Sequence, residues 1–198
     1  MGVAETSGPA EDAIAAMALF GEVLTKVDDE QLELATPCSQ WDVQSLISHV
    51  IVGDAGVPLL FAGQPLPADA AIDVSILGPN PVATWRGTAI AAIETFRAPG
   101  AMEAVVDHPT GPQPGSVVAR FRLVDVLTHA WDLAEATGID IEIPDELADA
   151  VLEFLLPMFD GLRDSEFFGD SIKPPDDAPS WQRMLGLLGR RGWPADAN

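Results

Sequence analysis

The chain has 198 residues, of which 47% are hydrophobic, so it can bury one sizeable core. It carries 31 acidic and 10 basic residues, for a formal charge of -21 at pH 7, and therefore has little capacity to displace counterions from phosphates. We expect no nucleic-acid partner and no attraction to anionic lipid.

Cysteine usage and the N-terminal charge pattern bear on the compartment. Cys38 is the single cysteine, which excludes an intramolecular disulfide and fits a reducing cytoplasm. The first basic residue is Lys26, so the apolar stretch from Ala13 to Phe20 lacks the positive flank of a signal peptide. No apolar run is long enough to span a bilayer. We expect a cytoplasmic protein with no membrane partner.

The first half of the chain predicts two long helices. Apolar residues recur at three- and four-residue spacing from Pro9 to Val27, which indicates an amphipathic helix. Asp42 can cap the N-terminus of a second helix, because apolar residues at helical spacing follow it directly. Residues 63–81 are rich in proline and glycine and are predicted to form a long loop.

Two further helices are predicted in the middle of the chain. Apolar residues from Val82 to Phe96 mark the third helix. The short, partly β-branched runs Met102–Asp107 and Gly115–Ala119 predict a small hairpin or extended crossover. The fourth helix follows from about Arg120 to Thr137, and the glycine after it can close its end.

The C-terminal part predicts shorter elements. Pro144 at a first-turn position begins a fifth helix that runs towards Leu156, and a short helix is expected near Trp181 to Leu188. Four long amphipathic segments joined by long connections predict a mainly all-α fold, an antiparallel four-helix bundle. We expect residues 1–198 to form one domain with a C-terminal appendage from about residue 163.

One spacing could serve metal binding. Asp125 and His129 are four residues apart in the fourth predicted helix, and four steps of about 100° return a side chain to within roughly 40° of its start. His49, on the inward face of the second helix, would complete a two-histidine, one-carboxylate site with open positions for water or substrate. The spacing alone is weak evidence, because roughly a sixth of the chain is acidic and a lone histidine is commonly a surface or hydrogen-bonded core residue.

Other side chains allow two interpretations each. Asp132, three residues after His129, can hydrogen-bond to that imidazole, although an exposed helix acid is equally consistent. No histidine is near Cys38 in the sequence, so we expect a small buried thiol there and not a nucleophile. His108, in a proline-rich loop, is expected on the surface, and Trp41 in the core or a pocket wall.

Basic residues are scarce, so their positions could matter for substrate binding. Arg120 and Arg122 near the predicted metal helix, and Arg190 and Arg191 near the C-terminus, could receive substrate carboxylates. Salt bridges to the many acidic residues are the alternative use.

Several stretches together resemble a known family. Residues 35–43, with Leu46 and His49 after them, look like the entrance to helix two of mycothiol-dependent maleylpyruvate isomerase-like proteins of the DinB/YfiT superfamily. Residues 122–134 resemble the same group's acid-x-x-x-His metal helix, and residues 136–138 its closing turn. Near the C-terminus, Phe168-Gly169, Pro175 and residues 185–190 resemble the tail of a single-domain metal-binding subgroup.

The resemblance implies a DinB-like four-helix bundle with a divalent metal on His49, Asp125 and His129, usually zinc, with nickel and iron as alternatives. It also implies mycothiol or a similar small thiol as cosubstrate, because a metal at the open position would lower the thiol pKa and favour attack on a small electrophile. The outcome would be isomerisation or S-transfer. This chain departs from the isomerase in two respects: that enzyme has glutamate where Asp125 stands, and it carries a C-terminal domain for which this chain looks too short.

Two other functions stay open. A hydrolase could use the same ion to activate water and cleave thiol conjugates, since relatives in the superfamily resemble amidases and deacylases. A metal-stabilised binding module without turnover would belong to another class. The oligomeric state cannot be read from the sequence, and a homodimer stays open.

Overall fold

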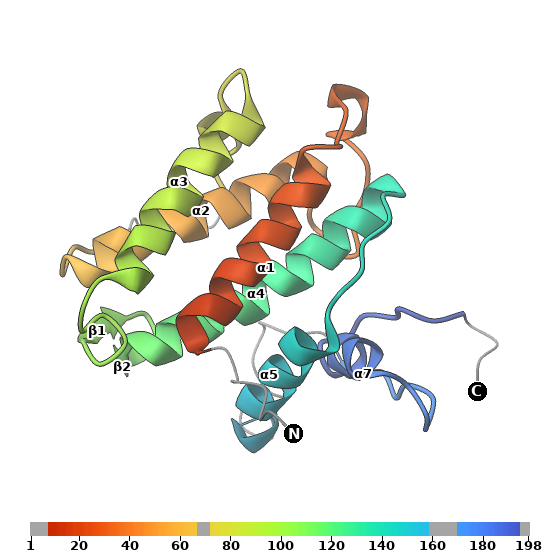
Figure 1. Ribbon diagram of the computed structural model, residues 1–198. Coiled ribbons are helices and arrows are strands. Elements are labelled where there is room, and N and C mark those ends of the chain that lie inside the picture. Colours follow the sequence, from red (N-terminus) through yellow and green to blue (C-terminus); the bar gives the residue numbers. More distant parts are fainter. Residues whose placement is uncertain (1–7, 67–71, 159–169, 195–198) are drawn as a thin grey trace, which may run out of the picture. The chain divides into compact units, whose positions relative to one another are not determined.

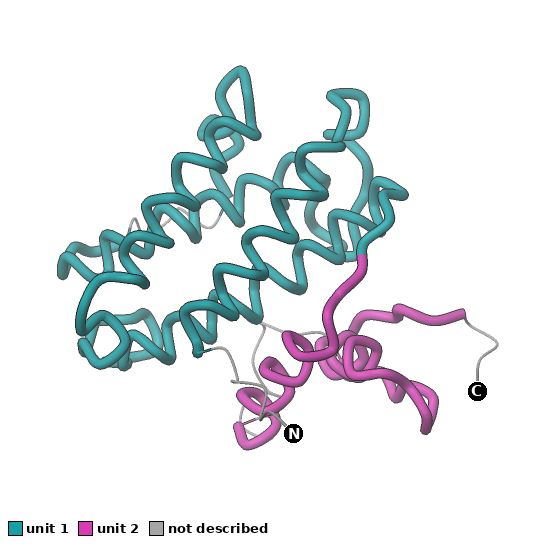
Figure 2. The backbone as a smooth tube through the Cα atoms, in the orientation of Figure 1, with its two compact units in different colours: residues 1–141 teal, residues 142–198 magenta. Residues whose placement is uncertain are grey.

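The structure is a computed structural model that describes residues 8–66, 72–158 and 170–194 (Figure 1). The chain divides into two compact units, residues 1–141 and 142–198, coloured teal and magenta in Figure 2. The single domain with an appendage from about residue 163 stays a prediction. Phe168 and Gly169, which contribute to the family resemblance, lie outside the described residues.

Four long helices form the first unit. They are α1 (Pro9–Leu24), α2 (Val43–Phe61), α3 (Pro81–Arg97) and α4 (Gly115–Thr137). Helix α1 packs against α4 and α3, and α2 packs against α3 and α4 (Figure 1). The four helices predicted from apolar spacing are therefore present. Two short 3-10 helices, η1 (Asp29–Gln31) and η2 (Val74–Leu77), lie in the connections, the second within the predicted long loop.

Helices α2 and α4 each have one end that the sequence marks clearly. Asp42 caps α2, because its side chain accepts a hydrogen bond from the Ser45 backbone N–H at 2.9 Å. Helix α4 ends at Gly138, which has a φ of 69° in the left-handed region that favours glycine. Both capping residues were predicted from the sequence. They set where α2 begins and where α4 ends.

A small hairpin precedes α4, but its second strand is not the segment that was predicted. Strands β1 (Val105–His108) and β2 (Gly111–Pro114) pair antiparallel, so the predicted hairpin is present. Residues 115–119, however, begin α4 and are not extended. Val118 and Ala119 are buried, and packing of this face overrides the β-branched preference. Gly115 allows the close start of the helix, because a Cβ there would collide with the Ala101 carbonyl oxygen.

Helix α2 is the most apolar of the long helices. By length and composition Val43–Phe61 could cross a membrane, contrary to the expectation that no segment could. However, 56% of this window is buried in the protein interior. Its apolar composition is therefore accounted for by packing against α3 and α4.

The second unit contains α5 (Asp145–Leu155), η3 (Leu156–Met158) and α7 (Ser180–Leu187), and α5 packs against α7. Pro144 is the residue before α5 and not in its first turn, but the fifth and the short C-terminal helix are present as predicted. There is no room for a side chain at Gly186, because the Ile172 carbonyl oxygen and the Trp193 ring lie close to where a Cβ would be.

Candidate metal site

Three side chains predicted as metal ligands come together between α2 and α4. His49 Nε2 lies 3.0 Å from Asp125 Oδ1, and His129 Nε2 lies 3.4 Å from the same oxygen. One ligand atom from each residue lies within 4.8 Å of the other two. Asp125 and His129 share one face of α4, as their spacing requires, and His49 reaches them from α2. The arrangement offers two imidazole nitrogens and one carboxylate oxygen to a common point.

Asp125 is the centre of the charge pattern. Burial alone would raise the pKa of its carboxyl group, but the neighbouring His49, Arg122 and His129 hold it well below its usual range. Its second oxygen, Oδ2, accepts a hydrogen bond from Arg122 at 2.7 Å. Oδ1 is therefore the oxygen that faces both imidazoles, and the carboxyl group is ionised at neutral pH.

His129 is held from both sides. Its Nδ1 lies 3.0 Å from Oδ2 of Asp132, a residue with no exposed surface. Without metal the protonated ring can donate from Nδ1 to Asp132 and from Nε2 towards Asp125, and once the Nε2 proton is lost Asp132 keeps the remaining proton on Nδ1 and leaves Nε2 free for a metal ion. Burial lowers the pKa of His129, but Asp125, Asp132 and Cys38 raise it well above its usual value. Of the two interpretations of Asp132, the hydrogen-bonded one is confirmed.

Arg122 is engaged by two carboxylates. Its Nη1 donates to Asp125 Oδ2 and its Nη2 to Asp54 Oδ1, both at 2.7 Å. Nη2 also points at the Val50 carbonyl oxygen, 3.4 Å away. Burial raises the pKa of Asp54, and the guanidinium opposes that rise. The salt-bridge alternative for Arg122 is therefore the one observed.

Gly53 on α2 makes room for this guanidinium. A Cβ at this position would collide with the Arg122 head group, which cannot move freely because Asp54 and Asp125 hold it. We expect Gly53→Ala to lower the free energy of unfolding by about 1–3 kcal/mol, the usual cost of overpacking. Denaturant unfolding measures this, and Gly87→Ala on α3, where a Cβ meets nothing, is the control and should stabilise or leave the protein unchanged. An unaffected Gly53→Ala variant would contradict the packing argument.

Two residues beside the cluster were not predicted to contact it. Cys38 is half-buried and not fully buried, and its Sγ lies 3.2 Å from Asp132 Oδ2 and 3.9 Å from His129 Nδ1. The ring of Trp41 lies 4.6 Å from that of His49 and 5.4 Å from that of His129. Both come from the loop before α2, where Thr36 Oγ1 donates to the Trp41 carbonyl oxygen at 2.8 Å. This loop covers one side of the imidazole pair.

Cys38, His129 and Asp132 form a second group of donor atoms that lie within 4.8 Å of one another. Both groups share His129, but through different nitrogens. In this second group the carboxylate and the nitrogen already hydrogen-bond to each other, and Asp132 is fully buried. The group of His49, Asp125 and His129 is more accessible, because the His49 and Asp125 side chains are 23% and 27% exposed. It is the better candidate for exchange with a ligand in solution.

A cavity of about 430 Å³ adjoins the cluster at His49. It lies between α2, η2, β1 and α4, and His108 and Phe121 form part of its wall with rings 5.0 Å apart and nearly parallel. His108 is partly exposed, as expected for a surface residue, but one side of its ring is covered by Phe121. Burial lowers the pKa of His108, so this imidazole is neutral at pH 7.

The comparisons with known proteins agree with this arrangement of helices. Residues 13–134 match the model of the mycothiol maleylpyruvate isomerase N-terminal domain, which is more than half of the chain. The chain belongs to this family. The matched residues include α2 and nearly all of α4, and hence every member of the candidate cluster.

Relatives of known sequence and structure extend the likeness beyond that domain. Two uncharacterized proteins from strains of Mycobacterium tuberculosis, MT0763 and Rv0738, are each 37% identical over 175 residues, covering 86% of this chain and 91% of theirs. Crystal structures of the mycothiol-dependent maleylpyruvate isomerase and of a histidine-to-alanine mutant share the fold, with a TM-score of 0.66 and 19% and 16% identity.

These structural matches correct one expectation. They cover 92% of this chain and 88% of the isomerase chain, so only about an eighth of that chain has no counterpart here. The expectation that this chain is too short to contain the isomerase's C-terminal domain is therefore wrong in extent. The amino-acid composition did not indicate a counterpart of that C-terminal region, because the C-terminal helices are short and separated by proline-rich segments.

Proposed function

We propose that the protein is a metal-dependent thiol S-transferase or isomerase, in which His49, Asp125 and His129 hold one divalent metal ion and a small thiol of the mycothiol type is the cosubstrate. The observation that supports it most is the approach of two imidazole nitrogens to one carboxylate oxygen, at 3.0 and 3.4 Å. Membership of the mycothiol maleylpyruvate isomerase N-terminal domain family supports the thiol.

The donor set fits zinc in number, chemistry and spacing. Two ligand atoms, each about 2.1 Å from a tetrahedral zinc ion, lie roughly 3.4 Å apart, close to both separations on Asp125 Oδ1. Three protein ligands leave a further position open, as in catalytic zinc sites. The shorter aspartate, in place of the isomerase's glutamate, still brings Oδ1 to 3.4 Å from His129 Nε2, because the two residues lie one turn apart on the same face of α4. Nickel and iron accept the same ligands.

The protein's own groups would divide the work between them. A bound divalent metal would lower the pKa of a coordinated thiol and keep it as a thiolate at neutral pH. Asp132 fixes the tautomer and orientation of His129. Arg122 occupies Asp125 Oδ2, so that Oδ1 alone faces the imidazoles. Trp41 covers the two rings and limits the access of water.

The proposal includes the topology of the helices, the compartment and the partners of the protein. Helices α1 to α4 would form the DinB-like antiparallel bundle, since each packs on two of the others. A single cysteine and an acidic composition support a cytoplasmic protein. Small molecules, a thiol and an electrophile, would be its partners, and a homodimer stays open.

The test combines metal analysis with a thiol-dependent assay. Protein purified without added chelator should contain about one zinc, nickel or iron per chain. In the presence of mycothiol, it should increase the rate at which an electrophile such as N-ethylmaleimide is consumed above the rate with mycothiol alone. A folded, metal-free protein that gives no rate enhancement after zinc is added would end the proposal. Cleavage of a thiol conjugate without added thiol would instead indicate a hydrolase. Metal-dependent stabilisation with no turnover would indicate a binding module.

The raised pKa of His129 leads to a pH prediction. Without metal, protonated His129 stabilises the fold below about pH 6.5, and this contribution is lost as pH rises through the raised folded-state value. A metal ion must displace that proton, so its affinity rises with pH. We expect one equivalent of zinc to raise the melting temperature more at about pH 8 than at about pH 6. Calorimetry in buffers of different ionisation enthalpy should give about one released proton per ion, and a pH-independent zinc effect would contradict this.

A further inference from the structure

The cavity that begins at His49 has a composition that restricts its ligand. Its volume of about 430 Å³ is within the range of small-molecule sites. Of its fifteen described lining residues, eleven are apolar side chains or glycine. The other four are His49, Asp73, His108 and Arg122. All of these described residues belong to the first unit.

The cavity provides no excess positive charge. Arg122 is the one basic residue among the described lining residues, and its two terminal nitrogens donate to Asp54 and Asp125. Asp73 adds a further carboxylate at an exposed position. Without metal, the carboxylates of Asp54, Asp73 and Asp125 outnumber the two cations, Arg122 and protonated His129, and a divalent ion that displaces the His129 proton would bring the sum of these charges only to zero. A carboxylate entering this cavity would lose its water without gaining an unpaired cation: of the Arg122 nitrogens only Nε has no hydrogen-bond partner among the described residues, and that atom is buried.

The flat wall of the cavity is also uncharged. His108 Nδ1 accepts a hydrogen bond from the Thr110 backbone N–H at 3.2 Å, which places the proton of the neutral ring on Nε2. Stacked on Phe121 at an interplanar angle of 17°, the ring presents an aromatic surface and not a cation.

We propose that this cavity binds an uncharged, mainly apolar small molecule with a planar group, and that it discriminates against ligands that carry carboxylates. In the proposed reaction this molecule is the electrophile, and that role rests on the proposed function; the binding itself does not. The substrate class would therefore differ from a dicarboxylate such as the maleylpyruvate in the name of the structural relatives.

The experiment compares 2-naphthylmethanol with 2-naphthoate, which differ mainly in charge, by equilibrium dialysis with the full chain. Chelator-treated protein provides the primary comparison, because a carboxylate could coordinate added zinc directly. We expect the alcohol to bind at least about tenfold more tightly than the anion, because the buried carboxylate stays unpaired. Zinc-loaded protein should still bind the alcohol.

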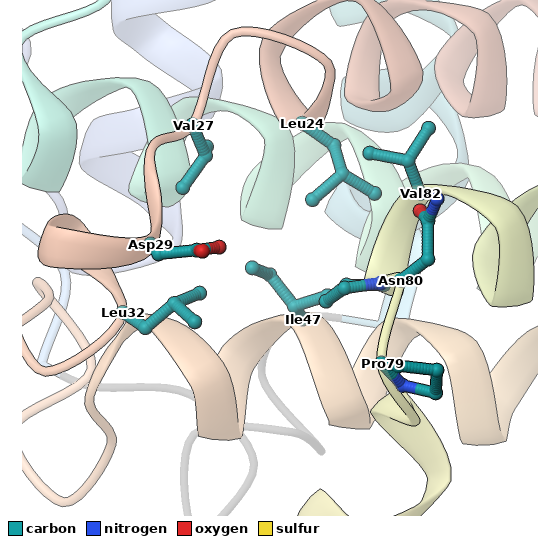
Figure 3. Close-up of a pocket in the computed structure, with 9 residues that line it drawn as sticks. Leu24, Val27, Asp29, Leu32, Ile47, Pro79, Asn80 and Val82 are labelled. Atoms are coloured by element: carbon teal, nitrogen blue, oxygen red, sulfur yellow. The ribbon is translucent and has the colours of Figure 1, made fainter.

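Two matched variants locate the binding. Ala55→Phe fills this cavity and should weaken binding of the alcohol at least about tenfold. Val82→Phe is the control, because Val82 lines a different cavity of about 250 Å³, together with Leu24 and Ile47 (Figure 3). It should leave binding unchanged.

A third variant tests the charge argument by a gain of binding. Asp54→Asn keeps an oxygen acceptor for Arg122 but removes one negative charge, and it should raise the affinity for 2-naphthoate at least about threefold relative to the alcohol. Circular dichroism checks that each variant is folded. The proposal is overturned if naphthoate binds as tightly as the alcohol, if folded Ala55→Phe binds normally, or if the alcohol does not bind. Because dialysis needs neither metal nor thiol, failure of the proposed function leaves this result interpretable.

Discussion

Replacing any one of His49, Asp125 and His129 by alanine should reduce the metal content from about one ion per chain to near zero. Each substitution would remove one of the three proposed ligands, and loss of even a hydrogen-bonded partner of a ligand typically costs 10–100-fold in metal affinity. We expect losses greater than about 100-fold for the ligands themselves. Elemental analysis and competition with a chromophoric chelator measure the effect.

His108→Ala is the matched control for this series. His108 is outside the group of close donor atoms, so the variant should retain its metal. If all four histidine and aspartate variants kept the metal, the ion would be bound elsewhere. If only His49→Ala kept it while His129→Ala lost it, the group of Cys38, His129 and Asp132 would become the better candidate.

The proximity of the three candidate ligands could be predicted in part from helix geometry. Asp125 and His129 share a face whenever that segment is helical, and the strong apolar pattern and closing glycine made the helix secure. His49 belongs to a helix with an identifiable cap at Asp42. The family resemblance then related the two helices, which periodicity within either one could not do.

The residues that complete the site could not be predicted in the same way. Asp54 and Arg122 are 68 residues apart, and acids are frequent enough that no pattern distinguishes this one. Cys38 is 94 residues before Asp132, and it reaches the site through a turn in an irregular loop. Such contacts depend on how α2, α4 and that loop pack together. Sequence periodicity describes one element at a time and contains no information on this packing.

The error in secondary structure at residues 115–119 has a physical cause. Residues 115–119 contain two β-branched valines, which favour extended structure, and a glycine, which disfavours a helix. In the fold they extend α4 towards its N-terminus and bury Val118. Local preference amounts to tenths of a kcal/mol per residue, whereas burying a valine contributes about 1.5–3 kcal/mol, so packing decides.

Arg122→Met should lower the free energy of unfolding by about 3–5 kcal/mol, the usual cost of leaving a buried charge without its partner. Asp54 has no exposed surface, and among the described residues its Oδ2 has no hydrogen-bond partner, so the guanidinium is what compensates its charge. Denaturant unfolding followed by far-UV circular dichroism measures the loss. The double variant Arg122→Met with Asp54→Leu removes both charges and should recover most of it.

The pH dependence separates an unpaired charge from a simple packing defect. Burial already raises the pKa of Asp54 in the natural chain, and without Arg122 it should rise further. A folded-state pKa above the unfolded value means that ionisation opposes folding, so the penalty grows as pH rises from about 4 through the raised value. Arg122→Met should therefore be less destabilised at about pH 5 than at about pH 8, while the double variant shows no such difference. A loss independent of pH and unrepaired by Asp54→Leu would mean that Arg122 stabilises α2 and α4 through its packing alone.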